Sequence, residues 1–97
     1  MLELDGIGDR LAMLRGMGQV SARGLDRLCG YSERTCSAIE SGITVDPSTS
    51  TIASYADALG ASLDWIVRAK GSPPSRRAVL RAVRARMKER GWNGSDG

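Results

Sequence analysis

The chain has 97 residues, of which 41% are apolar and 4% aromatic, so it can bury one modest core that must be mainly aliphatic. No apolar run approaches the length of a membrane span and no signal-peptide pattern opens the chain, which predicts a cytoplasmic location. The net charge of +3 is unevenly distributed, because residues 1–69 hold six Arg and nine acids, a net −3, whereas residues 70–97 hold eight Lys or Arg and two acids, a net +6.

Helical periodicity runs along the whole sequence, and no stretch alternates with period two for long enough to predict a strand. The first predicted helix covers about residues 7–17 and has one apolar stripe, formed by Ile7, Leu11, Leu14 and Met17. The second begins after Ser21, a good capping residue, and ends at Gly30, because glycine readily adopts the left-handed backbone that closes a helix.

Three further short helices are predicted before residue 70. The third covers residues 33–41, and the hydroxyl of Ser32 is expected to cap it. A loop over residues 43–47 leads to a fourth helix that opens at Ser48 or Thr49. Ser62 is the expected cap of a short fifth helix, which completes an all-α domain over residues 1–69.

The remaining sequence is strongly basic. Residues 70–75 read Lys-Gly-Ser-Pro-Pro-Ser and predict a linker, because paired prolines cannot continue a helix. Residues 76–97 are expected to form a basic amphipathic helix to about residue 90 and a frayed end. This helix could pair with a dimer mate, lie on the core, contact phosphates, or be solvated with incidental charge. We expect it to dimerise through a thin apolar stripe, with electrostatic help from its arginines; the stripe consists of Val79, Leu80, Val83, Met87 and Trp92.

The first five helices closely resemble the Cro and lambda-repressor type of helix-turn-helix protein, also called the XRE family. The resemblance covers about residues 7–67 and rests on four pieces in the same order and spacing: Ile7-Gly-Asp-Arg-Leu11, Leu25 to Ser32, Ile39-Glu-Ser-Gly42 and Ala58-Leu-Gly-Ala-Ser-Leu-Asp-Trp65. It implies a compact five-helix lambda-repressor-like fold that binds DNA, to which this chain adds a C-terminal helix.

The resemblance also implies roles for individual residues. The third helix would enter the major groove and read base edges through Ser32, Glu33, Arg34, Ser37 and Ala38. Phosphates would be contacted by Arg23, Thr35, Thr44, Ser48 and Thr49. Arg34 is the best reader, because a guanidinium can pair with both acceptors of a guanine edge, although Glu33 and Arg34 could also form an ordinary solvated face. Arg15 and Glu40 match a salt bridge that fixes the angle of the third helix in family members.

Three positions depart from the family pattern. Ala22 stands where a Gln often reaches a phosphate. Asp26 replaces a small residue at the close approach of the second and third helices, and it needs a partner: Arg23, Arg27 or the N-terminus of the third helix. Gly24 weakens the second helix by about 1 kcal/mol relative to Ala.

The function expected from these features is that of a sequence-specific transcriptional regulator. We expect a repressor that binds a palindromic DNA operator as a homodimer, since a symmetric dimer reads two half-sites about 34 Å apart. The alternative is an adaptor that kept the fold and binds another regulator. This alternative is favoured by the net negative charge of residues 1–69 and by the loss of family phosphate contacts, such as that of the Gln replaced by Ala22.

Catalysis and metal chemistry are not expected. The sequence has no His, no phosphate-cradling glycine loop and no nucleophile paired with a base, so we expect no enzyme. No metal and no other cofactor is expected either. Cys29 and Cys36 are interpreted as small buried hydrophobes in a reducing compartment, with a disulfide between facing helices as the lesser alternative.

Overall fold

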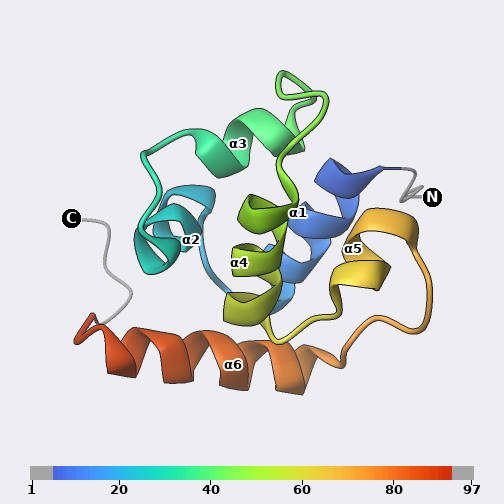
Figure 1. Cartoon of the computed structure of the whole chain (residues 1–97). Helices are drawn as coiled ribbons and strands as arrows, with labels where there is room; N and C mark the ends of the chain where they lie inside the picture. The colour runs from blue at the N-terminus through green and yellow to red at the C-terminus, as the bar shows by residue number, and fades with distance from the viewer. Residues whose placement is uncertain (1–5, 93–97) are drawn as a thin grey trace.

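The computed structural model describes residues 6–92. These residues form six α-helices joined by turns and loops, and they contain no strand (Figure 1). The helices are α1 (Ile7–Met17), α2 (Ala22–Cys29), α3 (Thr35–Glu40), α4 (Thr49–Leu59), α5 (Leu63–Arg68) and α6 (Arg76–Glu89). The all-α prediction is confirmed, and only α3 begins clearly later than the sequence predicts. The expected frayed end, residues 93–97, lies outside the described residues.

Serine side chains cap four of these helices. The hydroxyl oxygens of Ser21, Ser48, Ser62 and Ser75 each accept a hydrogen bond from the amide three residues later, at 2.9, 3.2, 3.4 and 3.1 Å. Such a cap satisfies one of the N–H groups that a helix leaves open at its start and contributes about 1 kcal/mol. Because the capping signal is local, the sequence predicts all four starts correctly.

An aliphatic core lies between the helices, with Tyr55 and Trp65 as its buried aromatic residues. Its largest fully buried aliphatic side chains are Leu11, Leu14, Leu25, Leu28, Ile52, Leu59, Ile66, Val79 and Val83. Helices α1, α2, α4 and α6 each contribute two residues of this set at helical spacing, and α5 contributes one. Cys36 and Ile39 anchor α3 to the same core, and Ile66 anchors α5.

The basic helix α6 is part of this core, so of the arrangements that the sequence left open the structure has the one in which this helix lies on the core. It packs along α1 and α4. A Cβ atom on Gly18 would lie 2.8 Å from a methyl carbon of Val83, and a Cβ on Gly60 would lie 2.8 Å from the Cβ of Ala82. These glycines therefore end helices and also make room for α6.

The apolar stripe of α6 is used mainly within the protomer. Val79 and Val83 are 0% exposed, so the expectation that they form a dimer interface is wrong: core packing already buries them. Leu80 is half-buried, and Met87 and Trp92 are half-buried against the core. Only these three residues of the stripe retain accessible surface.

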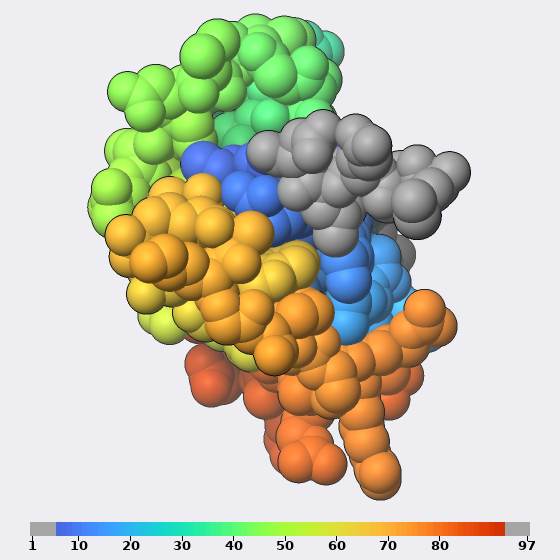
Figure 2. All heavy atoms as spheres, turned by 90° about the vertical axis from the view of Figure 1, so that its right-hand side faces the viewer, coloured from blue at the N-terminus to red at the C-terminus, as the bar shows by residue number. Residues whose placement is uncertain are grey.

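Helices α3 and α6 lie at opposite ends of the molecule. Figure 1 shows α3 at the top and α6 across the bottom, with α1 and α4 between them. The view turned by 90° keeps the same order from green to red (Figure 2). The basic face of α6 and the surface of α3 therefore do not form one continuous surface.

Candidate nucleic-acid interface

The turn between α2 and α3 contains two residues in the left-handed region. Gly30, with φ of 78°, ends α2, and Arg34, with φ of 80°, immediately precedes α3. Thr35 donates its amide hydrogen to the carbonyl of Ser32 at 3.3 Å, which closes a tight turn before the helix. The prediction that α3 starts at residue 33 under a Ser32 cap is therefore wrong, because this turn occupies the residues that were assigned to the first part of the helix.

A buried carboxylate occupies the N-terminus of α3 instead. Asp26 is 1% exposed, and both of its oxygens accept from the amide of Cys36, at 3.2 and 3.0 Å. Its Oδ1 also accepts from the hydroxyl of Tyr55 on α4. Burial, together with this hydrogen bond, raises the pKa of Tyr55, so the hydroxyl keeps its proton. Asp26 thus joins α2, α3 and α4 at the point where the helix dipole of α3 favours a negative charge.

Arg15 and Glu40 form a two-bond fork between α1 and α3. Nε of Arg15 donates to Oε2 of Glu40 at 2.8 Å, and Nη2 donates to Oε1 at 2.9 Å. The hydrogen bond to Glu40 raises the pKa of Arg15, and Nη1 also donates to the carbonyl of Val20 at 3.1 Å. The side chains are 26% and 13% exposed. The fork holds the last turn of α3 on α1 and so sets the angle at which α3 is presented.

We expect Arg15→Ala and Glu40→Ala each to lower the free energy of unfolding, and the double variant to lower it by less than the sum. A coupling of about 1 kcal/mol is expected for a partly buried, two-bond pair. Urea denaturation of the four proteins measures it. Additive losses, with no coupling, would show that the two residues act as separate surface charges.

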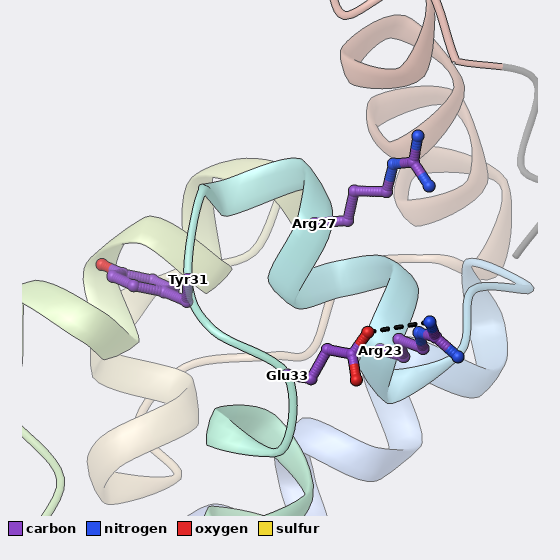
Figure 3. Close-up of a pocket in the computed structure, with 4 residues that line it drawn as sticks. All are labelled: Arg23, Arg27, Tyr31 and Glu33. Atoms are coloured by element: carbon purple, nitrogen blue, oxygen red, sulfur yellow. Dashed lines mark ion pairs between the residues drawn. The ribbon is translucent and has the colours of Figure 1, made fainter.

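A pocket of about 210 Å³ lies beside the turn and is lined by Arg23, Arg27, Tyr31 and Glu33 (Figure 3). Nη2 of Arg23 and Oε1 of Glu33 are 2.8 Å apart, and both side chains are more than 60% exposed. The guanidinium of Arg27 lies 5.2 Å from the centre of the Trp92 ring. The predicted phosphate contact Arg23 and the predicted base contact Glu33 are therefore paired with each other in the free protein.

The other residues predicted to read bases lie around the start of α3. Ser32, Arg34 and Ser37 are exposed, and Ala38 is half-buried. The hydroxyl of Ser37 donates to the carbonyl of Arg34 at 3.3 Å. Among residues 6–92 the ion pairs do not include Arg34, so its guanidinium is open to a ligand.

The hydroxyl residues predicted to contact phosphates are in different situations. Thr44 and Thr49 are exposed, in the loop after α3 and at the first position of α4. The hydroxyl of Ser48 caps α4. Thr35 is half-buried, and its hydroxyl donates to the carbonyl of Ser32 at 2.9 Å. Thr44 and Thr49 are thus the better placed of these four.

Arg10 is a structural residue that the sequence reading missed. It is 5% exposed, and its guanidinium donates to the carbonyls of Ile66, at 2.7 Å, and Val67, at 3.1 Å. These bonds satisfy carbonyl groups at the end of α5. The available signal was its position, since Arg10 follows Ile7 by three residues and precedes Leu14 by four, within the apolar stripe of α1.

Residues 6–92 contain no cluster of side chains suited to metal binding and no reactive thiol. No group of three or more His, Cys, Asp or Glu there could hold a metal ion, and Cys29 and Cys36 are both free thiols. Burial raises the pKa of Cys29 to about 11 and also raises the pKa of Cys36, so both thiols stay protonated near neutral pH and are poor nucleophiles. Across the same residues, every helix is too short or too polar to cross a membrane.

A comparison with known families adds to this geometry. A family model described as a helix-turn-helix domain matches residues 7–65, which is more than half of the chain. Searches of curated proteins and of solved structures find no match. The matched range includes α2, the turn, α3 and the fork between Arg15 and Glu40, and it leaves out α6.

Proposed function

The chain belongs to the helix-turn-helix domain family, and we propose that it is a sequence-specific repressor that lays α3 in the major groove of its operator. The contact to base edges is made from the residues at the start of α3, with Arg34, the residue that precedes the helix, as the principal reader. Ser37 and Ala38 lie on the same helix and read neighbouring positions. A cytoplasmic location belongs to the same proposal, since a repressor acts where polymerase meets the promoter.

The conformation of Arg34 is the observation that supports this proposal best. A side chain at φ of 80° is unfavourable by about 1 kcal/mol, and glycine would occupy that position without this cost. The guanidinium is nevertheless kept there, exposed and outside the ion pairs of residues 6–92. At this position it can reach O6 and N7 of a guanine together, which is the commonest specific contact between proteins and DNA.

The proposed regulator acts as a homodimer on a palindromic operator. Helix α3 has six residues and can touch only a few base pairs, so two copies are needed for a selective site. Two symmetric copies read half-sites one turn of DNA apart, and their occupancy blocks polymerase. Because Val79 and Val83 are in the core, they are not available for a dimer contact, and of the predicted stripe only Leu80, Met87 and Trp92 retain accessible surface.

We expect Arg34→Ala to weaken operator binding by about 1–3 kcal/mol and to relax the preference at one base pair. Arg34→Gly is the matched control: it removes the same side chain but also relieves the backbone, so it should bind as weakly as Arg34→Ala while unfolding at a higher urea concentration. Fluorescence anisotropy with operator and scrambled duplexes measures the binding. Unchanged affinity of both variants would rule out Arg34 as a reader.

The ion pair between Arg23 and Glu33 supports the alternative of an adaptor, because it occupies a predicted phosphate contact. A salt titration with random duplex DNA separates the two functions when it uses a variant in which the exposed cations of the outer face of α6, Arg77, Arg81, Arg84 and Lys88, are replaced by Gln, so that only the rest of the surface is tested. As salt is added, log K of a DNA-binding regulator falls with log salt, with a slope set by the number of phosphates that it neutralises. An adaptor does not show this salt-dependent binding to the duplex.

A further inference from the structure

The outer face of α6 carries a continuous row of cations. Arg77, Arg81, Arg84 and Lys88 are all exposed and follow one another at spacings of four, three and four residues. This spacing places them on one face, on the side of the helix opposite Val79 and Val83. At 1.5 Å per residue the row is about 16 Å long. Between its first members lies a hollow of about 370 Å³, lined by Arg77, Leu80, Arg81 and Arg84.

This row has no partner within the described part of the chain. None of the ion pairs of residues 6–92 includes a member of the row, and Glu89 is the one acid on α6. Like charges three and four residues apart destabilise a helix by a few tenths of a kcal/mol per pair. The arrangement therefore lowers the stability of the free protein and is suited to a partner with repeated negative charges.

The chemistry of the row favours a nucleic-acid backbone over a protein surface. Three of its four members are Arg, whose planar guanidinium forms two-bond forks with phosphate. Protein interfaces depend on a few large apolar or aromatic anchors, and this face offers only the half-buried Leu80 beside the small Ala78 and Ala85.

The position of the row rules out a contribution to the DNA held by α3. The two helices lie at opposite ends of a molecule whose extents are 34 × 27 × 26 Å (Figures 1 and 2). We propose that the outer face of α6 is a second DNA site, which holds the backbone of another duplex without reading its sequence, so that one protomer joins two duplexes. The binding of the first duplex rests on the proposed function, whereas the site on α6 does not.

A salt titration of a labelled random duplex tests the α6 site directly. Arg81→Gln with Arg84→Gln removes two members of the row. Arg76→Gln with Arg90→Gln removes the same charge outside the row, from the first residue of α6 and from its C-cap. The first pair should lower affinity at least tenfold and reduce the slope of log K against log salt by about two, whereas the second pair should leave that slope nearly unchanged. Equal effects of both pairs, or none, would overturn the proposal, as would binding of polyglutamate without binding of duplex.

Capture of a second duplex tests the joining of two duplexes. Protein bound to an operator duplex on beads should retain a labelled random duplex, and Arg81→Gln with Arg84→Gln should lose it while staying on the beads. If the protein binds the operator duplex on the beads but does not retain the second duplex, the α6 inference fails. If the bead duplex is not bound while the titration slope still depends on the row, the proposed role of α3 fails. Retention by the variant lacking the two charges would mean that two α3 helices of a dimer join the duplexes.

Discussion

Asp26→Ala is expected to lower the free energy of unfolding by about 3–5 kcal/mol. It removes the acceptor for two buried donors, the amide of Cys36 and the hydroxyl of Tyr55. Each buried group left without a hydrogen bond costs about 1–3 kcal/mol, and the helix dipole of α3 loses its counter-charge as well. Much of a typical stability of 5–15 kcal/mol would be lost.

Two comparisons separate this effect from general destabilisation. Tyr55→Phe removes one donor but leaves the carboxylate bonded to α3, so it should cost less than Asp26→Ala. Asp57→Ala removes an exposed acid from α4 and should change stability by about 0.5 kcal/mol or less. Urea denaturation followed by circular dichroism measures all three. A loss under about 1 kcal/mol for Asp26→Ala would show that α3 does not depend on this carboxylate.

Val83→Asp is expected to prevent stable folding, with a loss of at least about 4 kcal/mol. The side chain is fully buried between α6 and the rest of the core, beside Gly18, and a carboxylate there would have no partner. Ala85→Asp introduces the same charge at an exposed position of the same helix and should change stability by about 0.5 kcal/mol or less.

Thermal unfolding and sedimentation of these two variants test whether α6 belongs to the domain. If α6 were a detachable dimerisation tail, Val83→Asp would shift the protein toward monomer and leave the melting temperature unchanged. That result would contradict the packing of α6 along α1 and α4.

Local signals in the sequence were sufficient for most of the fold. The capping serines directly precede the helices that they start, and glycines directly follow α2 and α4. Because these signals adjoin the helix ends in sequence, the bounds of five helices could be predicted. The stripe of α6 showed that the helix has an apolar face, but periodicity does not identify what covers that face. The role of Gly18 and Gly60 in making room for α6 could not be predicted, because their contact with α6 joins residues distant in sequence.

The candidate site was predicted in part for the same reason. The sequence showed that Asp26 needs a partner, and the N-terminus of α3 was among the candidates. The hydrogen bond that Asp26 accepts from Tyr55 could not be predicted, because it spans 29 residues and has no local signal. The partnership of Arg15 with Glu40 came from the family resemblance. The left-handed backbone of Arg34 was missed, because the polar residues after Gly30 fit the start of a helix as well as they fit a turn.

Selection of bound sequences from a random duplex pool, carried out in parallel with the full chain and with Arg34→Ala, tests the reading of DNA by α3 most directly. We expect the full chain to enrich one motif made of two inverted half-sites about one helical turn apart, each with a guanine that Arg34→Ala no longer selects. Failure of the full chain to enrich any motif, or enrichment of the same motif by both proteins, would contradict it.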